Sequence, residues 1–138
     1  MVDEMRLLRL LRAITERIAV LRAETTADDR RRSDPLWLAG IKYTFVTAIE
    51  GCIDVAQHVC ASEGWGPPDT NGDAMSLLGR HGVLAPGLAE ALRRAVGFRN
   101  VLVHGYVVVD DTVVIRQLED LSDLEQFVGA IAELLRSD

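Results

Sequence analysis

Four polar side chains interrupt an apolar segment in the second half of the chain, AVGFRNVLVHGYVVVDD (residues 95–111). They belong to Arg99, Asn100, His104 and Tyr106. A histidine takes up or gives away a proton near neutral pH, and the planar guanidinium of an arginine matches the shape of a phosphate group. This set of residues is therefore suited to proton transfer beside a bound phosphate.

A helical pattern predicts how these residues are held. The residues that follow Pro86 at spacings of four and three form the seam of a helix that packs on its neighbours: Leu88, Leu92, Ala95, Arg99, Leu102 and Tyr106. Arg99 thus stands where an apolar side chain is expected. Because a buried, unpaired guanidinium is costly, we expect Arg99 either to have an acidic partner or to open onto a cleft. An internal ion pair beside a structural histidine near a helix end explains the same pattern without catalysis.

The angles between the polar side chains around the helix limit which of them are able to reach the same substrate atom. Asn100 and His104 lie on adjacent turns, whereas Arg99 and His104 lie ~140° apart on a regular helix. One copy of the chain would therefore not aim both side chains at one atom. A symmetric dimer would place two arginines and two histidines around one shared groove.

A second group of polar residues lies on the long helix predicted from Pro35 onward. Glu50, Asp54 and His58 recur every fourth residue and share one face of that helix. This face supplies either an acidic partner for Arg99 or a set of metal ligands. No second ligand cluster accompanies it in the sequence, so we predict no metal site, and we take Asp54 as the candidate that positions Arg99.

Further basic and titratable residues flank the motif. Arg93 and Arg94 precede Arg99 on the same predicted helix, where they either extend a phosphate-binding track for RNA or are simply solvated. His81, in the sequence GRHGVL, is predicted to lie in a loop.

The rest of the chain reads as an all-helical bundle with antiparallel neighbours, about five helices in a single domain. The charged run TTADDRRRSD is predicted to be a solvated loop, and the last helix is predicted to open on a capping box of Ser122 and Glu125. The domain spans residues 1–138, and the other helices are predicted over residues 3–24, 35–62, 73–80 and 86–106.

Residues 107–117, VVVDDTVVIRQ, are ambiguous. Their β-branched residues and the central Asp110-Asp111 fit a hairpin. A lone two-stranded ribbon would be marginal in a helical protein, so we favour an extended link into a short helix.

Composition excludes several classes of protein. A net charge of −6 argues against a protein that coats nucleic acid with a broad basic surface, although it leaves room for a local basic cleft. The segment MVDEMRLLRLLRAITERI alternates charge with leucine, unlike a signal peptide, and no run approaches the ~18 apolar residues of a membrane span. Cys52 and Cys60 form no Cys-x-x-Cys motif. We therefore expect a cytoplasmic protein with reduced thiols and no membrane partner.

The block FRNVLVHGY resembles the Arg-x-x-x-x-His-x-Tyr motif of HepT-type HEPN ribonuclease toxins, with Arg99, His104 and Tyr106 at the matching positions. The resemblance covers most of the chain. AIEGCIDVAQHV (residues 48–59) resembles the second helix of that family, and LEDLSDLEQF resembles its closing section.

This resemblance implies a HEPN-like antiparallel helical bundle that forms a homodimer, with the motifs of both protomers lining one cleft. It also implies a metal-independent endoribonuclease that needs no cofactor. The 2′-hydroxyl of RNA would attack the phosphate, His104 would transfer the proton, and Arg99 would hold the phosphate. Asn100 would orient the phosphate or the imidazole. The implied partner is an MntA-type nucleotidyltransferase antitoxin that transfers AMP to Tyr106.

Two other kinds of function fit the same helical pattern. The chain would be a non-catalytic helical module that binds a nucleotidyltransferase and presents its substrate, or a structural dimer in which Arg99 forms an internal ion pair. The non-catalytic module would not need an arginine and a histidine at the motif positions.

Overall fold

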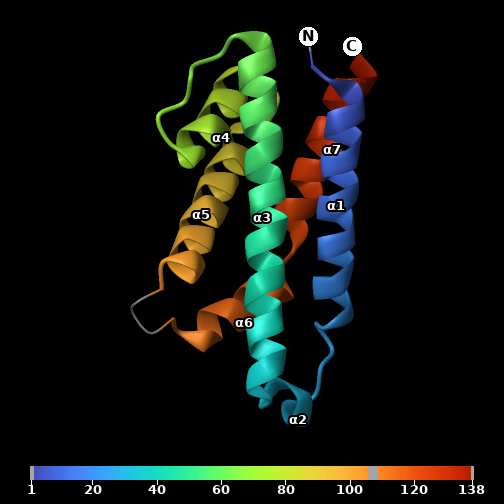
Figure 1. Ribbon diagram of the computed structural model, residues 1–138, viewed down its shortest axis with the longest axis vertical. Coiled ribbons are helices and arrows are strands. Elements are labelled where there is room, and N and C mark those ends of the chain that lie inside the picture. The colour runs from blue at the N-terminus through green and yellow to red at the C-terminus, as the bar shows by residue number, and fades with distance from the viewer. Residues whose placement is uncertain (1, 106–108, 138) are drawn as a thin grey trace.

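The computed structural model describes residues 2–105 and 109–137, and the regular elements in this part of the chain are helices (Figure 1). The predicted all-α fold is confirmed. Short additional elements raise the number of helices in these residues to seven, where about five were predicted. The helices are α1 (Glu4–Ala23), α2 (Asp29–Arg32), α3 (Pro35–Glu63), α4 (Asn71–Arg80), α5 (Pro86–Val103), α6 (Asp111–Glu119) and α7 (Ser122–Ser137).

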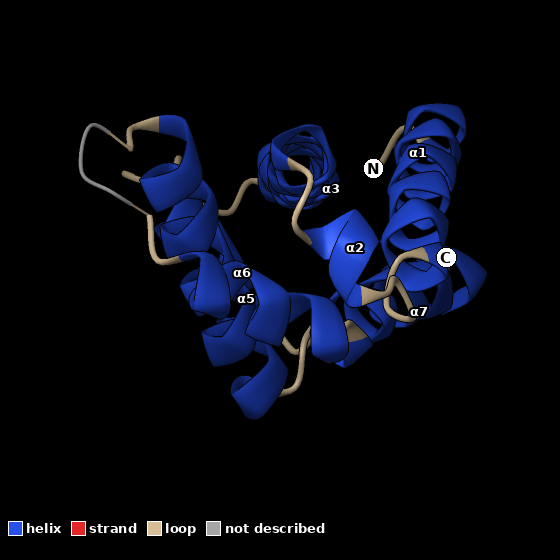
Figure 2. Ribbon diagram, turned by 90° about the horizontal axis from the view of Figure 1, so that it is seen from below, coloured by secondary structure: helices blue, strands red, loops and turns tan. Residues whose placement is uncertain are grey.

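Helix α3 is the centre of the bundle. It contacts α1 and α7 on one side and α4 and α5 on the other (Figures 1 and 2). The carboxylate of Asp34 accepts the backbone N–H of Leu36 at 2.9 Å, Pro35 occupies the first turn, and Gly64 caps the other end. The predicted start and end of this helix are therefore confirmed, and both follow from local capping chemistry.

Helix α3 is also apolar enough to meet the criteria for a membrane-spanning helix, with 29 residues and a mean hydropathy of 1.2 over its most apolar stretch. Its side chains account for this composition in another way. The buried residues of α3, among them Ile41, Phe45, Ile49, Cys52 and Val59, form one broad face packed against the surrounding helices. Packing of this face inside the bundle accounts for much of the hydropathy.

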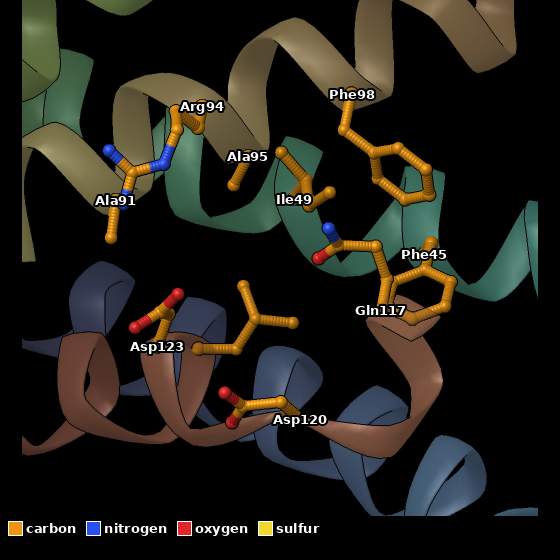
Figure 3. Close-up of a pocket in the computed structure, with 10 residues that line it drawn as sticks. Phe45, Ile49, Ala91, Arg94, Ala95, Phe98, Gln117, Asp120 and Asp123 are labelled. Carbon is orange, nitrogen blue, oxygen red and sulfur yellow. The ribbon is translucent and has the colours of Figure 1, made fainter. Parts of the chain in front are cut away.

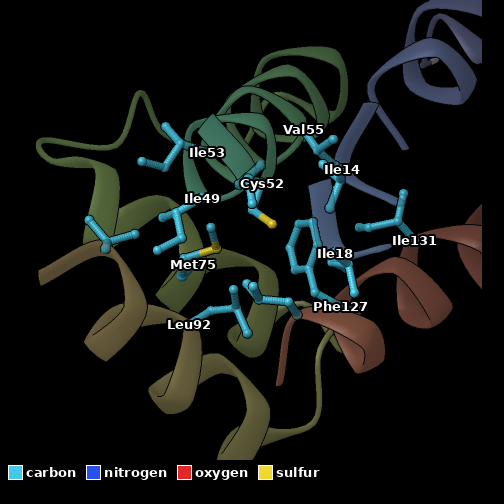
Figure 4. Close-up of a cluster of buried hydrophobic side chains, with 14 of the residues drawn as sticks. Ile14, Ile18, Ile49, Cys52, Ile53, Val55, Met75, Leu92, Phe127 and Ile131 are labelled. Atoms are coloured by element: carbon cyan, nitrogen blue, oxygen red, sulfur yellow. The ribbon is translucent and has the colours of Figure 1, made fainter. Parts of the chain in front are cut away.

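The core is built mainly from aliphatic side chains that six of the described helices contribute, α1 and α3 to α7. The helix predicted over residues 3–24 is confirmed as α1, and its apolar stripe is entirely buried: Leu7, Leu11, Ile14, Ile18 and Leu21. Figure 4 shows how this stripe meets side chains of α3, α4, α5 and α7, including Cys52, Met75, Leu92, Phe127 and Ile131. The bundle thus provides a rigid support for the ends of α3 and α5.

Helices α4 and α5 approach each other closely at Gly79. A Cβ atom added there would lie 2.7 Å from the Cβ of Ala89, which is attached to the α5 backbone. Replacing Gly79 by alanine is expected to lower the free energy of unfolding by roughly 1–3 kcal/mol, because the helices must separate to relieve the overlap. Urea denaturation measures this change.

Gly97 provides the matched control, because a Cβ added there meets nothing within 4 Å. Gly97→Ala is expected to leave the free energy of unfolding unchanged or to raise it by up to ~1 kcal/mol. Equal stability of Gly79→Ala and the wild type would contradict the close approach of α4 and α5.

Cys52 and Cys60 are free thiols, and both are buried. Burial raises the pKa of the Cys52 thiol to about 12 and also raises the pKa of Cys60. Because a raised pKa leaves less of the reactive thiolate, iodoacetamide at about pH 8 is expected to spare both cysteines in the folded protein and to alkylate both in urea. Intact-mass spectrometry counts the added groups, and rapid alkylation of the folded chain would contradict the burial.

One segment predicted as a loop contains a helix instead. The run TTADDRRRSD includes α2, which begins where the carboxylate of Asp28 accepts the N–H of Arg31 at 2.9 Å. The guanidinium of Arg31 in turn pairs with Glu24 at 2.6 Å. None of the residues of α2 is buried, so the predicted exposure is correct and the predicted lack of structure is wrong. Local side-chain contacts, rather than an apolar stripe, stabilise this turn.

The ambiguous segment before α7 is helical where the structure describes it. The carboxylate of Asp110 accepts both the N–H and the hydroxyl of Thr112, at 2.9 and 2.7 Å, and α6 begins at Asp111. The pair Asp110-Asp111 therefore caps a helix rather than turning a hairpin. The favoured reading is confirmed for residues 109–117, while residues 107–108 lie outside the described part.

Helix α7 begins at Ser122 as predicted, but its predicted capping box is wrong. Asp120 takes the capping role, because its carboxylate accepts the N–H of Ser122 at 3.0 Å and the hydroxyl at 2.6 Å. Glu125 forms an ion pair with Arg22 of α1 instead. That pair joins α7 to α1 across the bundle.

Candidate active site

Helix α5 carries the motif and packs through the predicted seam. Leu92 is fully buried, and Leu88, Ala95 and Leu102 are partly buried against the core. Arg99 lies in this partly buried seam, with 20% of its side chain exposed. The sequence pattern thus located Arg99 correctly.

Two contacts fix the surroundings of the C-terminal end of α5. The rings of Phe98 and Phe45 meet edge to face, with their centroids 5.4 Å apart, and hold α5 against α3. The Nζ atom of Lys42 lies 3.1 Å from a carboxylate oxygen of Asp111, which joins α3 to the start of α6. The end of α5 is therefore set against the N-terminal half of α3.

Arg99 is held at both terminal nitrogens of its guanidinium. Nη2 donates to Oε1 of Glu50 at 3.3 Å, and Nη1 donates to Oδ1 of Asn100 at 3.0 Å. The Nε atom is buried and has no hydrogen-bond partner among the described residues. The expectation that Arg99 has an acidic partner on a neighbouring helix is confirmed.

The acidic partner is Glu50 and not Asp54, so the prediction of Asp54 in this role is wrong. Asp54 is exposed, and no ion pair joins it to Arg99 among the described residues. Helices α3 and α5 run in opposite directions (Figure 1), so Asp54 lies beside earlier turns of α5. The relative register of two helices, which the sequence does not reveal, decides which carboxylate reaches Arg99.

His58, the third member of the polar face of α3, serves another purpose. Its Nε2 atom accepts the backbone N–H of Asp3 at 3.1 Å and lies 3.4 Å from the hydroxyl of Ser62. It therefore ties the start of α1 to α3. No group of three or more His, Cys, Asp or Glu side chains is placed to hold a metal ion in the described part of the chain.

His104 lies one residue beyond the end of α5. The helix ends at Val103, whereas the sequence pattern extended it to residue 106, and His104 is the C-terminal cap with φ −100° and ψ 19°. Its backbone N–H still donates to the carbonyl of Asn100 at 2.9 Å. The side chain of His104 is exposed to solvent. A histidine with free access to solvent is available to exchange protons with a substrate.

Gly105, the residue after His104, allows the chain to leave the helix at this point. A Cβ atom at Gly105 would lie 2.8 Å from the carbonyl oxygen of Val101, so the absence of a side chain permits the close approach. Tyr106, the predicted site of AMP transfer, lies outside the described residues.

Arg93 and Arg94, the two predicted RNA-binding residues, make contacts elsewhere on the bundle. Arg93 donates to the hydroxyl of Ser76 at 2.6 Å and lies 3.5 Å from a carboxylate oxygen of Asp73, both on α4. Arg94 lines a pocket of about 120 Å³ between α3, α5 and the α6–α7 region, with Asp120 and Asp123 across from it (Figure 3). The structure does not bring either arginine together with Arg99, and their binding of RNA stays a prediction.

His81 caps α4 at the opposite end of α5 from the motif. Its ring stacks on Trp65, with the centroids 3.9 Å apart and the planes within 4°. This histidine is therefore structural, and its exposure makes it a useful reference for His104.

Residues 9–131 match the family model described as ribonuclease HepT-like. The match covers most of the chain, and this protein therefore belongs to the HepT-like ribonuclease family. The family expected from the motif FRNVLVHGY is thus confirmed.

Similar proteins agree with this assignment. The mRNA nuclease HepT of Shewanella oneidensis is 32% identical over 83 residues, which cover 59% of this chain and 62% of that protein. The alignment thus spans about three fifths of the length of that relative.

Solved structures share the fold. The tri-AMPylated HEPN toxin of Shewanella oneidensis, in complex with an MNT antitoxin, superposes with a TM-score of 0.86 at 24% identity, covering 96% of this chain and 99% of the other. The cytosolic protein YutE of Bacillus subtilis superposes with a TM-score of 0.85 at 17% identity, covering 99% and 92%. The HEPN-like helical bundle is therefore the fold of this chain.

Proposed function

We propose that this protein is a metal-independent endoribonuclease and the toxin of a toxin–antitoxin pair. Membership of the HepT-like family and the similarity to an mRNA nuclease support this proposal. The observation that carries it is the combination at the end of α5: a partly buried guanidinium held at its two ends, and an exposed imidazole just beyond the helix.

The chemistry needs no metal because RNA carries its own nucleophile. The 2′-oxygen attacks the phosphorus as its proton passes to an imidazole, and the bond from phosphorus to the 5′-oxygen breaks. The leaving 5′-oxygen takes a proton, so the products are a 2′,3′-cyclic phosphate and a 5′-hydroxyl. His104 transfers the protons, and Arg99 stabilises the charge that develops on the phosphate.

A homodimer would complete the site. Val101 and Val103 lie in the last turn of α5 and are 55% and 44% exposed, so a second copy that packs on this end of the helix would cover two apolar side chains. Two histidines from two copies then divide the roles of base and acid, although one histidine can perform both in sequence. Asn100 contributes by holding the guanidinium of Arg99.

The partner that neutralises such a toxin is a nucleotidyltransferase antitoxin in the same cytoplasm. The similar toxin from Shewanella oneidensis is described as tri-AMPylated and bound to its antitoxin. AMP on Tyr106 would add bulk and negative charge close to His104 in the sequence, which repels the RNA backbone.

Replacing Tyr106 by phenylalanine is expected to abolish AMP transfer and to leave RNA cleavage within about two-fold of the wild type, because the phenol accepts AMP and takes no part in proton transfer. Mass spectrometry of the protein co-expressed with its cognate nucleotidyltransferase measures the modification. Unchanged addition of AMP to Tyr106→Phe would contradict the assignment of this residue.

The purified wild-type chain, without any partner, tests the proposed activity. It is expected to cut a labelled RNA in the presence of EDTA, and His81→Ala is expected to cut at the same rate. An inert wild type that still binds the nucleotidyltransferase would support a non-catalytic module instead.

A further inference from the structure

We propose that Glu50 is a positioning residue that orients Arg99 toward the scissile phosphate and, through its own charge, weakens the binding of RNA in the ground state. This inference rests on the proposed ribonuclease activity. It concerns a residue on a different helix from the motif.

The hydrogen-bond donors of Arg99 define where a phosphate is able to bind. A guanidinium has five N–H groups, one on Nε and two on each Nη. The N–H of Nε is buried, so it is closed to an external ligand. One N–H of Nη2 is directed to Glu50 and one of Nη1 to Asn100. Each Nη keeps one further N–H. A phosphate therefore binds at the outer end of the guanidinium, across Nη1 and Nη2, rather than along the edge that contains Nε.

Glu50 is the contact that fixes this outer end relative to the bundle. Asn100 neighbours Arg99 on the same helix, so its hydrogen bond does not fix the position of the guanidinium relative to α3. Glu50 belongs to α3, and its contact at 3.3 Å crosses between the helices. Without it, a long side chain with 20% of its surface exposed would sample other rotamers, and catalysis is sensitive to such displacements.

The same carboxylate opposes the binding of RNA. Glu50 is 43% exposed and in contact with Arg99, so its charge lies close to any phosphate that Arg99 holds. A carboxylate in contact with the guanidinium both neutralises part of its charge and repels a phosphate placed nearby. Glu50 therefore favours the correct orientation of Arg99 at the expense of affinity.

Glu50→Gln tests both effects at once, because it replaces the charged carboxylate by a neutral amide of the same size, which leaves Arg99 only a weaker, uncharged acceptor. Cleavage under saturating RNA is expected to slow by roughly ten- to hundred-fold because this weaker hydrogen bond holds Arg99 less firmly in its orientation. RNA is expected to bind about three-fold more tightly when the repulsion disappears. A loss of packing alone would weaken both quantities together and lower the thermal midpoint.

Asp54→Asn is the matched control. It removes the same charge from the same helix one turn away, and Asp54 makes no ion pair with Arg99 among the described residues. Its turnover is expected to equal that of the wild type. Affinity is measured with each substitution placed in a His104→Ala background, in which RNA is expected to bind normally and to be cut far more slowly.

The outcomes distinguish this inference from the proposed function. A slow turnover with tighter binding in Glu50→Gln alone, at an unchanged thermal midpoint, supports the positioning role. If Glu50→Gln and Asp54→Asn behave alike while the wild type cuts RNA, the positioning role is wrong and the ribonuclease proposal stands. If the wild type does not cut RNA, both proposals fall.

Discussion

Replacing His104 by alanine is expected to lower the rate of RNA cleavage by ~10²–10⁴-fold, the usual contribution of a general acid–base group. The side chain is exposed and lies beyond the helix end, so its removal is not expected to disturb the core. The affinity for RNA should therefore stay close to that of the wild type. Single-turnover cleavage of a labelled RNA in EDTA measures the rate, and a binding assay measures the affinity.

His81→Ala is the control for this variant, because it removes an exposed imidazole that stacks on Trp65 at the far end of α5. It should cut RNA at the wild-type rate. If His104→Ala also cuts at that rate, the imidazole beside the motif takes no part in the reaction and another proton carrier must be sought.

Replacing Arg99 by alanine is expected to reduce turnover by ~10²–10³-fold, as for the loss of one preorganised donor to a developing negative charge. Unlike the loss of His104, this change should also weaken RNA binding and reduce the slope of log affinity against log salt by about 1. The expected cost in stability is small because the partner Glu50 is 43% exposed and remains hydrated.

Arg80→Ala provides the reference for a lost surface arginine, since Arg80 is exposed in the last turn of α4. Arg99→Lys is a second useful variant, because it keeps the positive charge and loses the planar guanidinium that binds a phosphate through two N–H groups. It should retain the salt dependence and lose most of the turnover. Full turnover in Arg99→Ala would place the phosphate-binding group elsewhere.

Most of the helices follow from local signals in the sequence. Asp34 and Pro35 specify the start of α3, and the stripe from Leu7 to Leu21 specifies the buried face of α1. The sequence pattern does not predict helix α2, because the stability of this helix comes from capping and ion pairs of exposed residues, which leave no apolar periodicity. Local propensity alone does not separate such a turn from a loop.

The candidate site was predictable in its residue types and only partly in its contacts. An arginine in an apolar seam predicts an acidic partner, because an unpaired buried guanidinium is costly. The structure provides this partner in Glu50. Whether Glu50 or Asp54 contacts Arg99 depends on the axial register of α3 relative to α5. Many core contacts distant from the site set that register together. The end of α5 at Val103 likewise depends on the close approach that Gly105 allows, rather than on periodicity.

In the proposed reaction RNA supplies its own nucleophile, and a single altered nucleotide tests this most directly. Two oligonucleotides are compared in EDTA, identical except for one 2′-deoxynucleotide on the 5′ side of the mapped cleavage site. We predict that the wild-type chain cuts the all-ribose strand to a 2′,3′-cyclic phosphate and a 5′-hydroxyl, and leaves the altered linkage intact. Cleavage of both strands at equal rates, or products that carry a 5′-phosphate, would contradict the mechanism.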